Sequence, residues 1–280
     1  MVEILILIKI RGFAMNKGER AELKFIATLG CYLGKTVNLW SNQTSPVLVA
    51  NVAVPLRGTN LSRSIGIYPQ SINPATIAAM SDSQLASLCS NLKITKAGPY
   101  SKSDVFLNGA GYSIKYTDGA PPALINHTNR VGWQQAASHA GINISSLDLL
   151  IDDYWNKRIN GFIKEDVANS NPNSPFSNHL STLKPFLDYF CFEGSGKKVS
   201  DHPAQGIIEF SDPCDITTWK EFSKANYINT VWPNLVFSIR SKKGMPPNIS
   251  SIDLAKRNSI LKWSRDFQGS LRGALHVRFK

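Results

Sequence analysis

Apolar and polar positions along this 280-residue chain follow patterns that predict both helices and strands. Ala21, Ile26 and Leu29 recur at helical spacing over residues 16–33, and Asn16 is placed to cap that helix. Further helices are expected at residues 74–92, 131–140, 146–169, 176–190 and 215–227. Strands are expected at residues 47–55, 206–210, 234–240 and 274–279. This mixture predicts a domain of the α/β (α+β) class.

The clearest local signal is a β-hairpin. Two strand-like runs, residues 104–107 and 111–116, flank the pair Asn108-Gly109, and Asn-Gly is the strongest short-range mark of a tight turn. Alternate residues of a strand point to opposite faces, so one face of this hairpin is apolar and can pack on the core. That face carries Val105, Leu107, Tyr112 and Ile114.

The other face of the hairpin carries the candidate chemistry. A two-residue turn sets Asp104 opposite Ser113, whereas a four-residue loop sets Asp104 opposite Lys115. In both registers the three side chains share one face, and a three-residue loop would break this alignment. A carboxylate beside an ammonium group suits metal-assisted phosphodiester hydrolysis, because Mg²⁺ binds through one or two carboxylates and a lysine stabilises charge on the phosphate. The alternative is a structural cross-strand ion pair.

Charge and composition limit the classes of partner and the cell compartment that we expect. With 31 Lys and Arg against 20 Asp and Glu, the net charge is +11, which would attract a polyanion such as nucleic acid. The four cysteines are far apart and show no zinc spacing, which predicts reduced thiols. Reduced thiols are typical of a cytoplasmic protein, and no apolar run is long enough for a membrane-spanning helix, so no membrane partner is expected. Residues 1–14 are interpreted as a short edge strand or as an extension before a working start at Met15.

These motifs carry a resemblance to a known family. Asp104 followed by Ser113-Ile114-Lys115 resembles the PD-(D/E)xK nuclease motif, with serine at the second acidic position. Residues 16–22 (NKGERAE) resemble the NKGE-type helix of HpaII-like type II restriction endonucleases. Residues 111–126 (GYSIK continuing to LIN) resemble the GFSIK-type strand of that group and its continuation.

The resemblance covers residues 15–130 and implies one restriction-endonuclease-like domain over residues 1–280, a mixed central sheet flanked by helices. On this view residues 15–130 form the catalytic core, and residues 131–280 pack on it and contact DNA. The implied activity is Mg²⁺-dependent, sequence-specific hydrolysis of double-stranded DNA that leaves 5′-phosphate and 3′-hydroxyl ends. A palindromic target would imply a homodimer, or a monomer that nicks each strand in turn.

The resemblance also implies roles for single residues. Asp104 would be the principal metal ligand and Lys115 the catalytic lysine, while Ser113 leaves one carboxylate missing. Glu22 or Glu19 of the first predicted helix is the expected replacement, with Glu22 preferred because it lies deeper in the helix. DNA contacts are expected from polar and basic side chains outside the hairpin, as phosphate and base contacts require. These are Asn126, Asn129, Arg130, Arg240, Lys242, Lys243 and Arg272.

Two other functions fit the same residues. In a DNA-binding protein without catalysis, the pair formed by Asp104 and Lys115 would be structural. A repair or recombination nuclease of the same fold would recognise DNA structure instead of sequence. Discrete fragments from one plasmid would indicate sequence recognition, whereas a smear or nicking would not.

Overall fold

The computed structural model of the chain describes residues 15–32, 37–41, 46–49, 71–92, 94, 100–107, 110–119, 123–240 and 274–280. Its helices are α1 (Lys17–Cys31), α2 (Pro74–Ala79), α3 (Asp82–Asn91), α4 (Arg130–Ala140), α5 (Ser145–Ile159), α6 (Leu180–Asp188) and α7 (Lys224–Val231). Its strands are β1 (Val37–Ser41), β2 (Pro46–Val49), β3 (Val105–Leu107), β4 (Ala110–Tyr116), β5 (Ala123–Asn129), β6 (Gly206–Phe210), β7 (Lys220–Ser223), β8 (Leu235–Arg240) and β9 (Ala274–Phe279). The predicted mixed α/β class is confirmed.

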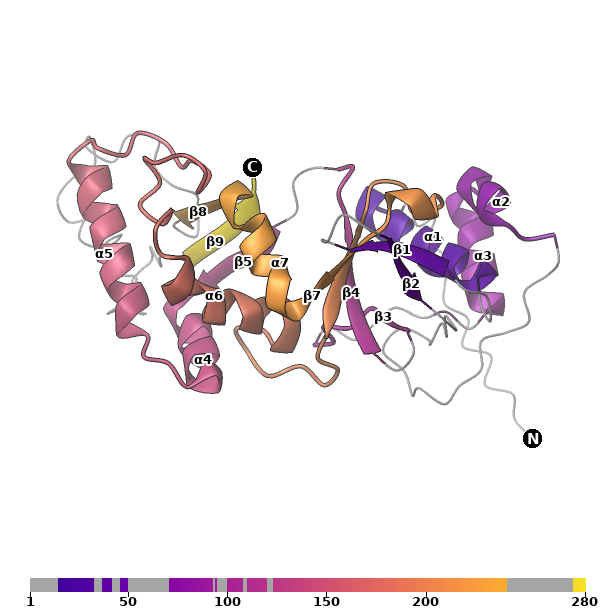
Figure 1. Cartoon of the computed structure of the whole chain (residues 1–280), viewed down its shortest axis with the longest axis horizontal. Coiled ribbons are helices and arrows are strands. Elements are labelled where there is room, and N and C mark those ends of the chain that lie inside the picture. The colour runs from indigo at the N-terminus through magenta and orange to yellow at the C-terminus, as the bar shows by residue number, and fades with distance from the viewer. Residues whose placement is uncertain are drawn as a thin grey trace.

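The described strands form two sheets. The first has the order β2-β1-β7-β6-β4-β3, and the second has the order β5-β9-β8. In the first sheet β3 and β4 form an antiparallel hairpin, while β6 runs parallel to β4 on its other side. In Figure 1 α1, α2 and α3 lie on one side of this sheet, and α6 and α7 lie on the other.

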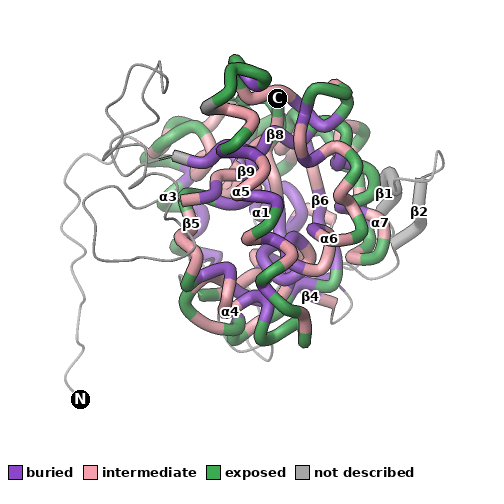
Figure 2. The backbone as a smooth tube through the Cα atoms, turned by 90° about the vertical axis from the view of Figure 1, so that its left-hand side faces the viewer, coloured by how far each residue is buried: buried purple, intermediate pink, exposed green. Residues whose placement is uncertain are grey.

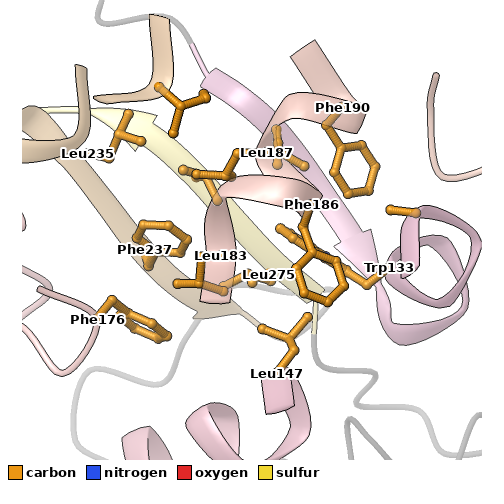
Figure 3. Close-up of a cluster of buried hydrophobic side chains, with 14 of the residues drawn as sticks. Trp133, Leu147, Phe176, Leu183, Phe186, Leu187, Phe190, Leu235, Phe237 and Leu275 are labelled. Carbon is orange, nitrogen blue, oxygen red and sulfur yellow. The ribbon is translucent and has the colours of Figure 1, made fainter. Parts of the chain in front are cut away.

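Two clusters of buried side chains cover the two faces of the first sheet. On one face Phe25 of α1 packs with Val105 and Ile114. The centroid of its ring lies 4.7 Å from the ring centroid of Phe210. On the other face Ile207 joins a larger cluster that reaches the second sheet. Figure 3 shows this larger cluster, in which side chains of α6 lie between α4 and the strands of the second sheet. Figure 2 shows buried positions concentrated inside the molecule, with exposed positions around them.

Several predicted elements need correction. The helix expected over residues 74–92 is two helices, because Ser81 and Gln84 form a capping box that starts α3. The helix expected over residues 146–169 ends at Ile159, and Gly161 follows with a φ of 76°.

The sequence between residues 176 and 227 also differs from the prediction. The expected helix over residues 176–190 begins only at Leu180 and continues as a π-helix, η1 (Tyr189–Glu193). The expected helix over residues 215–227 is wrong, since the chain forms a 3₁₀ turn (Ile216–Thr218), then β7, then α7. Pairing of β7 with β6 explains this difference, because it buries Phe222 beside Ile207.

Other predictions concern thiols and membranes. All four cysteines are free, as expected, with Cys89 and Cys191 buried and the other two half-buried. No helix in the described part of the chain is long and apolar enough to cross a bilayer. The interpretation of residues 1–14 and the predicted strand beyond Val49 lie outside the described residues.

An ion pair between α1 and α3 gives a first testable prediction. Arg20 Nη2 donates to Asp82 Oδ2 at 2.9 Å, and this hydrogen bond is the main reason that the pKa of Asp82 falls from 3.8 to about 2. A lowered pKa in the folded state contributes stability above pH 3.8 that is lost as the pH falls through about 2. At pH 5, Asp82→Asn should therefore melt at a lower temperature than the wild type. On acidification to pH 2 its melting temperature should fall by less than that of the wild type, as circular dichroism can measure.

The control for this prediction is Asp201→Asn, which changes an exposed carboxylate paired with Lys198 in a surface loop. Its melting temperature should follow that of the wild type at every pH. Equal acid dependence in Asp82→Asn and the wild type would contradict the stabilising role of the ion pair.

Candidate active site on the β3–β4 hairpin

The hairpin has the register of the two-residue turn. Leu107 pairs with Ala110 and Val105 with Tyr112, so Asp104 lies opposite Ser113, the first of the two predicted alternatives. The turn residues 108–109 lie outside the described part of the chain. The apolar face is confirmed as core, since Val105 and Leu107 are buried against α1 and α3.

Asp104 is held in place by the neighbouring strand. Its Oδ2 accepts hydrogen bonds from the hydroxyl of Ser113, at 3.2 Å, and from the backbone N–H of Ile114, at 3.0 Å. Its own N–H donates to the carbonyl of Tyr112 at 2.7 Å. Ser113 is only 4% exposed, so this hydroxyl is a buried donor committed to the carboxylate. The Asp104 carboxylate therefore has a fixed orientation on the face that Ser113 shares with Lys115.

The chain before Asp104 is anchored to a second segment, residues 200–203. The backbone N–H groups of Lys102 and Ser103 both donate to the carbonyl of His202, and the hydroxyl of Ser103 donates to the carbonyl of Pro203 at 2.8 Å. Gly111 allows this close approach, because a Cβ atom there would lie 2.1 Å from Ser103 Oγ. A distant loop thus fixes the position of the candidate catalytic aspartate.

Glu209 is a site residue that sequence reasoning missed. It lies on β6 directly beside Lys115 on β4 in the parallel register, so both side chains point to the same face. The hydroxyl of Tyr227, on α7, donates to Glu209 Oε1 at 3.0 Å. Burial raises the pKa of Glu209, while Tyr227, Lys220 and Lys115 act in the opposite direction. A single carboxylate inside an otherwise apolar strand, GIIEF, was the available signal.

Lys102 is a second residue that sequence reasoning missed. Burial lowers its pKa, and the positive charge of Lys115 lowers it further, while Asp104 acts in the opposite direction. The positive charges of Lys102 and Lys115 therefore both lie near the Asp104 carboxylate. Two positive charges beside one negative charge favour binding of an anionic group such as a phosphate. The position of Lys102 two residues before Asp104 was the only signal in the sequence.

The π-helix η1 lies over this face of the sheet. Cys191 is buried there and interacts electrostatically with both Lys102 and Lys115, and burial raises the pKa of its thiol to about 12. At neutral pH the thiol is therefore protonated and is not a nucleophile. Nearby, Lys184 Nζ pairs with Asp188 Oδ2 at 2.6 Å. A buried thiol and an ion pair thus lie close to the two lysines of the site.

The N-terminal helix carries the two glutamates that were predicted as metal ligands. Glu19 and Glu22 belong to α1, whose buried residues pack against the face opposite to that of Ser113 and Lys115. Among the residues that the structure describes, no group of three or more His, Cys, Asp or Glu side chains could hold a metal ion. The predicted pairing of Asp104 with either Glu22 or Glu19 needs only two carboxylates and stays a prediction.

The residues predicted to contact DNA after the hairpin have different surroundings. Asn126 of β5 is exposed. Asn129 caps α4 by accepting a hydrogen bond from the N–H of Gly132 at 3.2 Å. Arg130 donates through Nε and Nη2 to the two carboxylate oxygens of Asp148, at 2.9 and 2.7 Å. Asn129 thus caps α4 and Arg130 joins α4 to α5, and the predicted contacts of all three residues with DNA stay predictions.

The remaining basic residues predicted to contact DNA lie at or beyond the end of β8. Arg240 is the last residue of β8, and Lys242, Lys243 and Arg272 lie outside the described residues. Comparison with known proteins adds no relative, since no family model, curated protein or solved structure matches this chain. The assignment of function therefore depends on the chemistry of the hairpin face.

Proposed function

We propose that this chain is a Mg²⁺-dependent endonuclease of type II restriction type that cuts double-stranded DNA at a short recognition sequence. The observation that carries the proposal is the Asp104 carboxylate, oriented by Ser113 on a face that also presents Lys115. The resemblance of residues 15–130 to HpaII-like restriction endonucleases supports the same assignment. On this proposal the first sheet, between α1–α3 and α6–α7, is a restriction-endonuclease-like core.

The donors present fit a magnesium ion bound partly by substrate. Mg²⁺ takes oxygen ligands and commonly uses one or two carboxylates together with substrate phosphates and several waters. Asp104 supplies one oriented carboxylate, and the DNA phosphate would supply further oxygens. When bound, the ion would polarise the scissile phosphate and activate a water for attack.

The protein's own groups would prepare the substrate. Ser113 and the N–H of Ile114 hold the Asp104 carboxylate, so that it does not need to reorganise during the reaction. The ammonium groups of Lys115 and Lys102 would attract the phosphate and stabilise the charge that develops on it. Hydrolysis through an activated water needs no protein nucleophile, which agrees with the protonated state of Cys191.

A DNA-binding protein without catalysis is the second candidate. It is favoured by the two hydrogen bonds that Asp104 accepts from Ser113 and Ile114, because they give this carboxylate a structural role in the hairpin. Two lysines around one carboxylate could bind a phosphate without hydrolysing it. Both candidates use the net charge of +11 to hold DNA, so binding by itself does not separate them.

A digest of one plasmid separates the candidates. Incubated with Mg²⁺, the protein should cut unmethylated plasmid into discrete fragments, and EDTA should prevent this. A smear or nicked circles would indicate a structure-specific nuclease of the same fold. Retarded but uncut plasmid in Mg²⁺ and in Mn²⁺ would contradict the endonuclease and favour the DNA-binding protein.

A further inference from the structure

We propose that Glu209 is a positioning residue, whose carboxylate holds the ammonium of Lys115 on the face that carries Asp104. This inference rests on the proposed endonuclease function and adds a residue to the same site. Glu209 acts through Lys115 and does not contact the reacting phosphate.

The register of the first sheet places the two residues side by side. Lys115 and Glu209 are direct neighbours on the parallel strands β4 and β6, and neighbouring strands lie about 4.8 Å apart. Asp104 lies on the far side of β4, opposite Ser113. Lys115 therefore has Glu209 directly beside it on β6 and Asp104 diagonally across from it on the other side of β4, so that the carboxylate of Glu209 can attract its ammonium group. Without Glu209, the lysine stem would have more rotamers available.

The carboxylate of Glu209 is held by one hydrogen bond and lies beside a cavity. Tyr227 is fully buried and directs its hydroxyl at Glu209 Oε1. Glu209 also lines a cavity of about 300 Å³, together with Thr117, Thr230 and Asn234. The charged and titratable groups that act on this carboxylate are Tyr227 of α7, Lys220 of β7 and Lys115 of β4. Two of them are cations, so a negative charge at Glu209 is supported although burial opposes it.

The opposite face of the same sheet offers a matched control. There the hydroxyl of Tyr112 donates to Glu221 Oε1 at 2.6 Å, so a second tyrosine–glutamate pair exists. Glu221 is paired with Ile208, which belongs to the cluster around α1, so this pair lies away from Lys115. The two pairs share strands and chemistry and differ in the face they occupy.

The decisive variants are Glu209→Gln and Glu221→Gln, assayed for cleavage over a range of pH. Glu209→Gln should lower kcat by about 10- to 100-fold with little change in KM, as is typical when the support of a catalytic group is lost. Glu221→Gln should leave kcat within about two-fold of the wild type. Glu209→Asp, which restores the charge, should recover part of the lost kcat.

The pH profile distinguishes positioning from a loss of stability. Because burial raises the pKa of Glu209 above 4.5, wild-type kcat should fall with acidification before an ordinary glutamate would be protonated. Glu209→Gln has no charge to lose, so its low kcat should lack this acid limb. If Glu209→Gln does not fold, Tyr227→Phe replaces it as the test, because it removes the hydrogen bond to Glu209 and keeps the carboxylate. It should lower kcat by about five-fold, and Tyr112→Phe is its control.

The outcomes separate this inference from the function on which it rests. If wild-type protein cuts DNA but Glu209→Gln and Glu221→Gln have equal kcat and the same acid limb, Glu209 is not a positioning residue and the endonuclease stands. If wild-type protein does not cut DNA, the endonuclease fails and the role of Glu209 fails with it. The same acid limb in wild type and Glu209→Gln would also overturn the inference.

Discussion

Replacing Asp104 with asparagine should reduce Mg²⁺-dependent DNA cleavage by at least about 10³-fold, because a metal supplies several kcal/mol of transition-state stabilisation. The amide oxygen of asparagine can still accept hydrogen bonds from Ser113 and the N–H of Ile114, so the hairpin should stay folded. Only the negative charge that binds the ion is lost. Single-turnover assays on supercoiled plasmid with wild-type and variant protein measure this effect.

DNA binding should survive the Asp104→Asn substitution. Log affinity should fall with log salt with a slope of about −0.9 for each phosphate neutralised, and the slope should be the same in both proteins. Asp118→Asn is the control, since Asp118 is an exposed carboxylate just beyond β4 that pairs with Lys17. Equal cleavage by Asp104→Asn and the wild type would contradict the role of Asp104 as a metal ligand.

Gly111→Ala is expected to have the largest effect on stability. A Cβ atom at this position would meet Ser103 Oγ at 2.1 Å and the carbonyl of Pro203 at 3.1 Å. Ser103 is completely buried and its hydroxyl is committed to Pro203, so it cannot move aside without losing a hydrogen bond. Overpacking of this kind costs about 1–3 kcal/mol of unfolding free energy, measurable by urea denaturation. Cleavage should fall too, since the displaced segment positions Asp104.

Two further variants test the explanation for Gly111. Gly119→Ala should change stability by less than about 0.5 kcal/mol, because its Cβ would meet only ring atoms of Tyr116, at 3.6 Å. Adding Ser103→Gly to Gly111→Ala removes the clashing side chain and should recover part of the lost stability. If Gly111→Ala were as stable as the wild type, the explanation that Gly111 lies in close contact with Ser103 would be contradicted.

Local sequence signals predicted the parts of the fold that depend on local interactions. The hairpin followed from alternation around Asn108-Gly109, and the start of α1 followed from the Asn16 side chain, which accepts the N–H of Glu19 at 2.9 Å. Both depend on residues within a few positions of one another. The split between α2 and α3 could also have been predicted, since Ser81 followed by Gln84 is a capping box.

Long-range pairing decided what the sequence could not predict. β7 forms where a helix was expected because it pairs with β6 and, in parallel, with β1, which is about 180 residues away in the chain. For the same reason Glu209 was missed: its place beside Lys115 depends on the parallel pairing of β4 with β6. The ion pair between Arg130 and Asp148 of α5 also joins two elements that the sequence pattern did not bring together.

The proposed endonuclease activity is tested by digesting unmethylated phage DNA with the wild-type protein and then treating the products with DNA ligase. We predict discrete fragments that form with Mg²⁺, do not form with EDTA, and rejoin because hydrolysis leaves 5′-phosphate and 3′-hydroxyl ends. Uncut DNA across several phage genomes and divalent metals would contradict the claim that the hairpin carrying Asp104 and Lys115 is a nuclease active site.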